Sequence, residues 1–107
     1  MSNQKGGFSN VVKQAQRMQQ QIARVQDQMA DREVEATSGG GAVLAAVNGR
    51  QAVVKLEINP EVIDPSDPET LSELVMTAVN LAMENAQEMI QTEVNKITGG
   101  LSIPGLF

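Results

Sequence analysis

The sequence predicts a mixed α/β fold of the α+β type, in which a long helix, a three-stranded antiparallel sheet and a second long helix follow one another. Three observations support this: a heptad pattern of apolar residues near the start, an Asn-Gly pair between two apolar runs, and a long amphipathic stretch without Gly or Pro near the end. The 107 residues are enough for one domain. We expect this domain to span residues 1–107, with flexible ends at about 1–7 and 101–107.

The first helix is predicted from about Ser9 to about Arg32, with Ser9 or Asn10 as its N-cap. Its apolar residues alternate in steps of three and four, which is the seam of a heptad repeat. They are Phe8, Val11, Ala15, Met18, Ile22, Val25 and Met29. This seam packs either on the second helix or sheet of the same chain or on another chain. We favour packing within the chain over most of its length.

The sheet is predicted from residues 33–37, 42–47 and 51–58, with Gly39–Gly41 as a turn that leads into a strand. Asn48-Gly49 is typical of a two-residue type I′ hairpin turn, because both of its central residues need a positive φ. Such a turn would place Val47 opposite Arg50.

This register would also place Val43 opposite Val54, which puts Leu44, Ala46 and Val53 together on the second face of the sheet. That face would be too apolar to remain exposed. The core is also thin, because Phe8 and Phe107 are the only aromatic residues. We therefore expect a homodimer whose interface contains Leu44, Ala46 and Val53.

The second helix is predicted from Pro68 to Ile97. Ser66 or Asp67 can serve as the N-cap, and Pro68 is well suited to the first turn. Thr98-Gly99-Gly100 should end the helix. The acidic residues around its start are explained by capping and by the positive end of the helix, without a metal ion.

The composition argues against an enzyme. The chain has no His and no Cys, so the commonest general base, the commonest metal ligand and the thiolate nucleophile are all missing. We therefore expect no catalytic residues, no metal, no cofactor and no small-molecule substrate. The sequence contains neither a signal peptide nor an apolar run of membrane-spanning length, so we expect a cytoplasmic protein without a membrane partner.

The net charge of −5 hides an uneven distribution. Four of the eight basic residues, and none of the thirteen acidic ones, lie in the first 26 residues. On the first helix Lys13, Arg17, Gln20 and Arg24 share the face opposite the apolar seam. This stripe is either an ordinary solvated face or a surface for phosphate groups, and the absence of acidic neighbours favours the phosphates.

Short motifs along nearly the whole chain are similar to those of one family. They are residues 13–19, 40–43, 47–49, 58–65, 71–75, 78–82, 98–100 and 104–106. In this ordered set the chain resembles the YbaB/EbfC family of nucleoid-associated proteins. The resemblance implies a homodimer with long helical arms, shaped like tweezers. It also implies binding to double-stranded DNA that alters DNA conformation, with roles in nucleoid organisation, gene regulation or DNA protection.

Residues 83–88 depart from the pattern of those relatives that carry basic residues in the middle of the second helix, because this stretch is acidic here. DNA contact should therefore depend on the first helix. We expect weak, salt-sensitive contact with the phosphate backbone in the nucleoid, through a DNA-binding set of Lys5, Lys13, Arg17, Arg24, Gln14 and Gln20. The alternative is a protein-interaction module that binds a partner through the helical seam or the apolar C-terminal tail.

Overall fold

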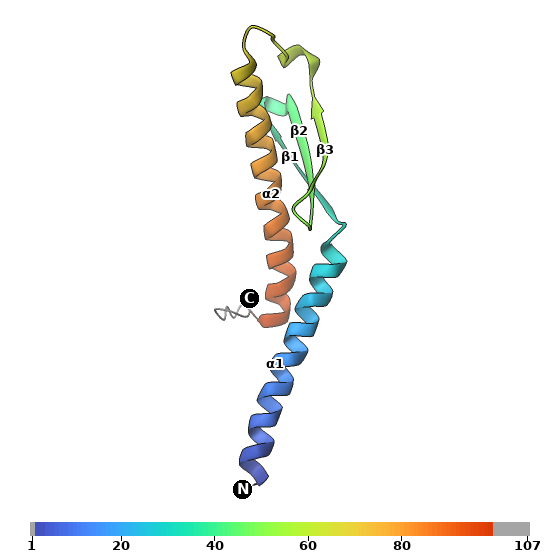
Figure 1. Cartoon of the computed structure of the whole chain (residues 1–107), viewed down its shortest axis with the longest axis vertical. Helices are drawn as coiled ribbons and strands as arrows, with labels where there is room; N and C mark the ends of the chain where they lie inside the picture. Colours follow the sequence, from blue (N-terminus) through green and yellow to red (C-terminus); the bar gives the residue numbers. More distant parts are fainter. Residues whose placement is uncertain (1, 100–107) are drawn as a thin grey trace.

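The protein is seen in a computed structural model that describes the backbone of residues 2–99 and the side chains of residues 7–99. Helix α1 (Ser2–Met29) is followed by strands β1 (Glu33–Ser38), β2 (Val43–Asn48) and β3 (Val53–Ile58), and then by helix α2 (Pro68–Thr98). Short 3-10 turns lie at Gly39–Gly41 and Pro60–Val62. This order confirms the predicted helix–sheet–helix fold. The molecule is elongated, with extents of 77 × 21 × 16 Å, and α1 extends well beyond the end of α2 (Figure 1).

The predicted bounds of the first helix are wrong at both ends. Helix α1 begins at Ser2, so Ser9 and Asn10 lie inside it and do not cap it. It ends at Met29 instead of Arg32, where the Arg32 amide donates to the Met29 carbonyl at 3.0 Å in a turn. The glycines near its start lower helix propensity without ending the helix, because glycine in a helix costs only about 1 kcal/mol relative to alanine.

The predicted hairpin register is also wrong. Strand β2 pairs with β3 so that Val43 lies opposite Ile58 and Val47 opposite Val53, with a bulge at that end of the ladder. Four residues lie between the two strands, and the left-handed position falls on Gln51, at φ 63°. The Asn48 side chain stabilises the loop by accepting hydrogen bonds from the amides of Arg50, at 2.9 Å, and of Ala52, at 3.1 Å.

A close approach of two backbone segments explains why glycine follows Asn48. A Cβ at position 49 would collide with the Met29 carbonyl group, only 2.7 Å from its carbon. Position 49 therefore lies against the last turn of α1. Its glycine is required for this packing, and not for the positive φ of a type I′ turn.

The observed register makes the outer face of the sheet, which points away from α2, polar and not apolar as predicted. Glu35 and Lys55 lie opposite Ala46 on either side of it, and their charged groups are 3.9 Å apart. They cover Ala46, which is only 1% exposed within the single chain. Val53 lies opposite Val47, whose side chain faces the helix, so it is not aligned with Leu44 and Ala46 as predicted.

The core lies between α2 and the first two strands. Alanines on one face of α2 meet a row of side chains from β2, and all are fully buried: Ala78, Ala82 and Ala86 against Val43, Ala45 and Val47. Because alanine is small, the helix can lie close to the sheet. The predicted ends of this helix are confirmed. Asp67 accepts a hydrogen bond from the Thr70 amide, and Gly99 adopts the left-handed cap conformation.

Candidate nucleic-acid interface

The N-terminal half of α1 is a projecting helix. Helices α1 and α2 run side by side in opposite directions, and α1 continues past the point where α2 ends (Figure 1). We call residues 8–18 of α1 the arm, and the rest of the described molecule the body. The exposed fraction of the seam residues rises along this direction, from 8% at Ile22 to 64% at Val11 and 74% at Phe8. Packing of the seam on the second helix of the same chain is thus confirmed near Ile22, and within the described residues it does not extend over the arm.

The predicted cationic residues lie on the exposed side of this helix. Lys13, Arg17 and Arg24 are all exposed, as are Gln14 and Gln20. Their spacing along a regular helix places Lys13, Arg17 and Arg24 on one face, with Gln20 between them, over roughly 16 Å of helix length. Lys5 belongs to α1, but its side chain lies outside the described residues.

Three basic side chains outside α1 behave differently, because acidic neighbours neutralise them, whereas the Arg32 guanidinium donates to the Met29 sulfur at 3.7 Å. Arg50 pairs with Asp31, and Lys96 lies 2.9 Å from Glu93. Lys55 lies 3.3 Å from Glu57 and is also close to Glu35. A hydrogen bond to Glu57, together with the negative charges of Glu57 and Glu35, raises the pKa of Lys55.

By contrast, the structure of residues 7–99 contains no ion pair for Lys13, Arg17 or Arg24. Their three charges are held on one helix face and are available to an external anion. A regular row of cations with exposed glutamines beside it matches a linear polyanion, because phosphate groups follow one another along a nucleic-acid strand.

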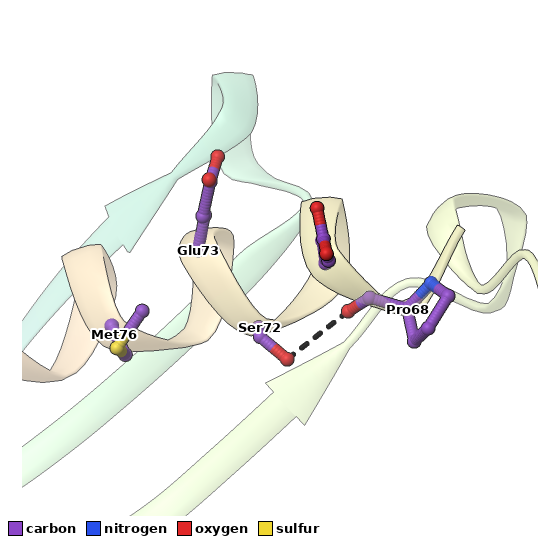
Figure 2. A pocket seen from close by; sticks show the side chains of 5 residues that line it. Pro68, Ser72, Glu73 and Met76 are labelled. Atoms are coloured by element: carbon purple, nitrogen blue, oxygen red, sulfur yellow. Dashed lines mark hydrogen bonds between the residues drawn. The ribbon is translucent and has the colours of Figure 1, made fainter.

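Shallow grooves on α2 have the opposite charge. One is lined by Glu84, Glu88 and two glutamines on the exposed side of the helix. Another, along the first turns of α2, is lined by Glu69, Glu73 and Met76 among others, and Figure 2 shows Glu73 and Met76 on successive turns of the helix. Carboxylates repel phosphate groups, so both grooves are poor nucleic-acid sites. The acidic character predicted for residues 83–88 is thus retained on an exposed surface.

The hydroxyl and carboxylate groups near the start of α2 are engaged locally. The Ser72 hydroxyl in the second groove donates to the Pro68 carbonyl at 3.0 Å (Figure 2). The side chain and the amide of Ser66 both donate to Asp64, and these hydrogen bonds lower the pKa of Asp64. Asp67 caps the helix. Capping therefore accounts for Asp67, as predicted, whereas Asp64 stabilises a local turn with Ser66.

Within the described part of the chain, no three His, Cys, Asp or Glu side chains are placed to hold a metal ion together. None of the helices described there is long and apolar enough to cross a membrane.

Sequence reasoning missed an apolar strip along β3. Val53, Val54 and Leu56 are each between 44% and 46% exposed. Met76 of α2 is 57% exposed. No sequence pattern indicates this exposure. It arises because α2 packs on β1 and β2 and leaves β3 uncovered.

Together, the fold and the cationic face define a small α+β protein with a positively charged projecting helix on an acidic body. A family model described as the YbaB/EbfC DNA-binding family matches residues 4–101. Several bacterial proteins are also similar to the chain over nearly its whole length. The chain belongs to the YbaB/EbfC DNA-binding family.

Two of these relatives are named nucleoid-associated proteins. The one from Thermoanaerobacter pseudethanolicus is 56% identical over 95% of this chain and 94% of its own length. The one from Caldanaerobacter subterraneus subsp. tengcongensis is 55% identical over the same shares. The crystal structure of an uncharacterised protein from Helicobacter pylori has the same fold, with a TM-score of 0.60. It is 24% identical and the match covers 70% of this chain and 87% of that one.

Proposed function

We propose that this chain is a nucleoid-associated protein that binds the phosphate backbone of double-stranded DNA through α1 and alters DNA conformation. One observation carries the proposal: Lys13, Arg17 and Arg24 share a helix face and have no acidic partner among the described residues, whereas Arg50, Lys55 and Lys96 are paired. Gln14 and Gln20 add neutral donors, and Lys5 adds a further cation. We assign the protein to the nucleoid and the cytoplasm, and give it no catalytic role.

The number of cations sets the expected strength of binding. Three or four phosphate contacts per chain would give six to eight in a dimer, and each contributes about −0.9 to the slope of log K against log salt. The acidic body opposes binding, although salt screens it beyond ~8 Å. We expect a dissociation constant near ~10⁻⁴–10⁻⁶ M at physiological salt.

The proposed homodimer forms along β3. This strand pairs with β2 on one side only, and α2 lies mainly over β1 and β2. An edge strand with exposed apolar residues is a template for pairing with another strand. A second copy that added its own β3 would cover Val53, Val54 and Leu56. Of the interface residues predicted from the sequence, the proposed interface keeps Val53. Val54 and Leu56 take the place of Leu44 and Ala46, since Ala46 is already buried within one chain.

The dimer is tested by sedimentation of the double variant Val54→Lys, Leu56→Lys. If β3 is the interface, this variant sediments as a monomer while its far-ultraviolet circular dichroism stays unchanged. The matched control is Thr37→Lys on the outer face of the sheet, which should remain a dimer. A wild-type protein that sediments as a monomer, or a double variant that stays dimeric, would reject this interface.

DNA binding is tested by fluorescence anisotropy of a labelled duplex of about 30 base pairs, at 50 and 200 mM salt. Saturable binding that collapses at the higher salt supports contact with the backbone. The double variant Arg17→Glu, Arg24→Glu should abolish binding. The control Arg50→Glu, Lys96→Glu changes the net charge equally and should retain binding apart from a uniform electrostatic loss. Equal losses in the two variants would contradict the assignment to α1.

A further inference from the structure

An apolar stripe continues along α1 beyond the end of α2. In the body this stripe is covered, because Ile22 is buried, and Met18 at the inner end of the arm is half-buried. In the arm the same stripe contains Phe8, Val11 and Ala15, which are exposed, with Val12 beside them. Ordinary solvated helices do not carry such a continuous apolar row, so a partner is expected to cover it. We call Phe8, Val11, Ala15 and Met18 the arm seam.

The chain itself supplies an apolar segment at this place. Helix α2 ends at Thr98, and its left-handed cap at Gly99 turns the chain out of the helix beside α1. Residues 101–107 follow, and their structure lies outside the described residues. Their sequence contains no charged side chain and includes Leu101, Ile103, Leu106 and Phe107.

We propose that residues 101–107 pack on the arm seam of their own chain. The segment starts where α2 stops covering α1, so it continues an interface that already exists. From Met18 to Phe8 the seam is roughly 15 Å long. Seven residues in extended conformation span about 23 Å, so the segment can reach the whole arm seam. The proposal does not depend on DNA binding.

A second copy of the arm would be a poorer cover. Every arm carries Lys13 and Arg17 on the face opposite the seam and has no acidic residue, so the pairing of two arms would form no ion pair to strengthen it. The tail adds apolar surface and has no charged side chain. It is also tethered, and a short flexible connection gives an effective concentration in the millimolar range.

A buried hydroxyl at the junction supports a further partner there. Thr98 is only 4% exposed, and its Oγ1 has no hydrogen-bond partner in the described structure. An unsatisfied buried hydroxyl costs about 1–3 kcal/mol, so a nearby backbone group of the tail would stabilise it.

The test uses engineered cysteines, since the natural chain has none. The pair Val11→Cys with Ile103→Cys should form a disulfide readily under mild oxidation. The matched control, Lys13→Cys with Ile103→Cys, places the first cysteine at the same height on the opposite helix face and should cross-link slowly. Equal cross-linking rates in the two pairs would overturn the proposal.

Mixing separates the chain's own tail from that of another subunit. Protein carrying only Val11→Cys is unfolded and refolded with protein carrying only Ile103→Cys. If the tail packs on its own chain, no covalent dimer of these two species forms, whereas the doubly substituted chain closes internally. A prominent mixed dimer would show that the tail packs on another subunit, and would overturn the proposal.

Hydrogen exchange gives a readout without cysteines. Deletion of residues 101–107 should speed amide exchange at residues 8–18 by about tenfold or more, because the arm loses its packing partner. Amides of β2 should be unaffected, which provides an internal control for folding. Unchanged exchange in the arm of a folded, truncated protein would reject docking of the tail.

Discussion

The arm and the body differ in the pairing of their basic side chains and in the burial of their apolar side chains. In the body, Arg50 and Lys55 are neutralised by nearby carboxylates, and the apolar side chains of β2 are buried under α2. In the arm, Lys13 and Arg17 have no acidic partner among the described residues, and Phe8 is 74% exposed. The arm contains no acidic residue, whereas all thirteen acidic residues lie in the body, so the contrast in ion pairing follows from the distribution of charge along the chain. The contrast in apolar burial follows from the position of α2, which covers β2 and not the arm.

This difference shows which surfaces the fold leaves for other molecules. The sheet and α2, with paired basic side chains and a filled core, gain little from an added partner, apart from the uncovered strand β3. An arm with unpaired cations on one face and an apolar stripe on the other can gain from two kinds of contact. The contrast predicts that similar substitutions will have different effects in the two regions.

The largest contrast concerns two glycines. Gly49→Val should lower the free energy of unfolding by ~3 kcal/mol, because the side chain would collide with the backbone at Met29. Gly7→Ala should instead be neutral or slightly stabilising, because no atom lies within 4 Å of its Cβ and alanine favours the helix. Urea denaturation followed by circular dichroism compares the two. A similar loss in both would contradict the packing of the hairpin on α1.

Two alanines provide the next comparison. Ala82→Leu should destabilise the protein by about 2 kcal/mol, since Ala82 is fully buried between α2 and the sheet. Ala15→Leu lies on the exposed arm and should change stability by less than about 0.5 kcal/mol. The midpoint of thermal unfolding measures both. A tolerated leucine at position 82 would mean that the helix lies farther from the sheet than described.

The cations can be compared through the salt dependence of DNA binding. Lys13→Gln should reduce the magnitude of the slope of log K against log salt by about 0.9, because one phosphate contact is lost. Lys96→Gln removes a paired charge of the body and should leave the slope unchanged. Titrations at four or five salt concentrations would resolve the two. Identical slopes would place the DNA on another surface.

The smallest effect concerns the titration of Asp64. Hydrogen bonds from Ser66 lower its pKa below the ordinary 3.8, so its stabilising contribution is present at neutral pH and is lost as the pH falls through this lowered pKa. Ser66→Ala removes the hydroxyl donor and should raise the pKa of Asp64 towards 3.8. NMR titration of the carboxyl carbon measures this. Ser72→Ala, whose hydroxyl contacts a carbonyl instead, should not move it.

Local signals predicted the elements well. The periodicity of apolar residues identified both helices, and Asp67 and Gly99 marked the ends of α2 because capping depends on neighbouring residues only. The hairpin register was wrong because Gly49 serves a contact with Met29, and such a contact between distant residues has no local signature.

The candidate site was predictable in part. Helix geometry alone places Lys13, Arg17 and Arg24 on one face, so the cationic stripe can be derived from spacing. Their lack of acidic partners could not be derived, because ion pairs such as Arg50 with Asp31 join residues far apart in the chain. The exposure of the arm was equally hidden, since the apolar spacing is the same where α2 covers it and where it does not.

The segregation of charge along the chain also gives each subunit a large electric dipole, because the opposite charges are far apart. The arm, which carries cations, lies towards one end of the 77 Å axis, and the start of α2, which is rich in acidic residues, lies towards the other (Figure 1). In the field of a polyanion such a molecule experiences a torque before it makes contact, and this torque turns the arm towards the polyanion. The net charge of −5 opposes the approach of the subunit as a whole, whereas the dipole determines which end faces the polyanion.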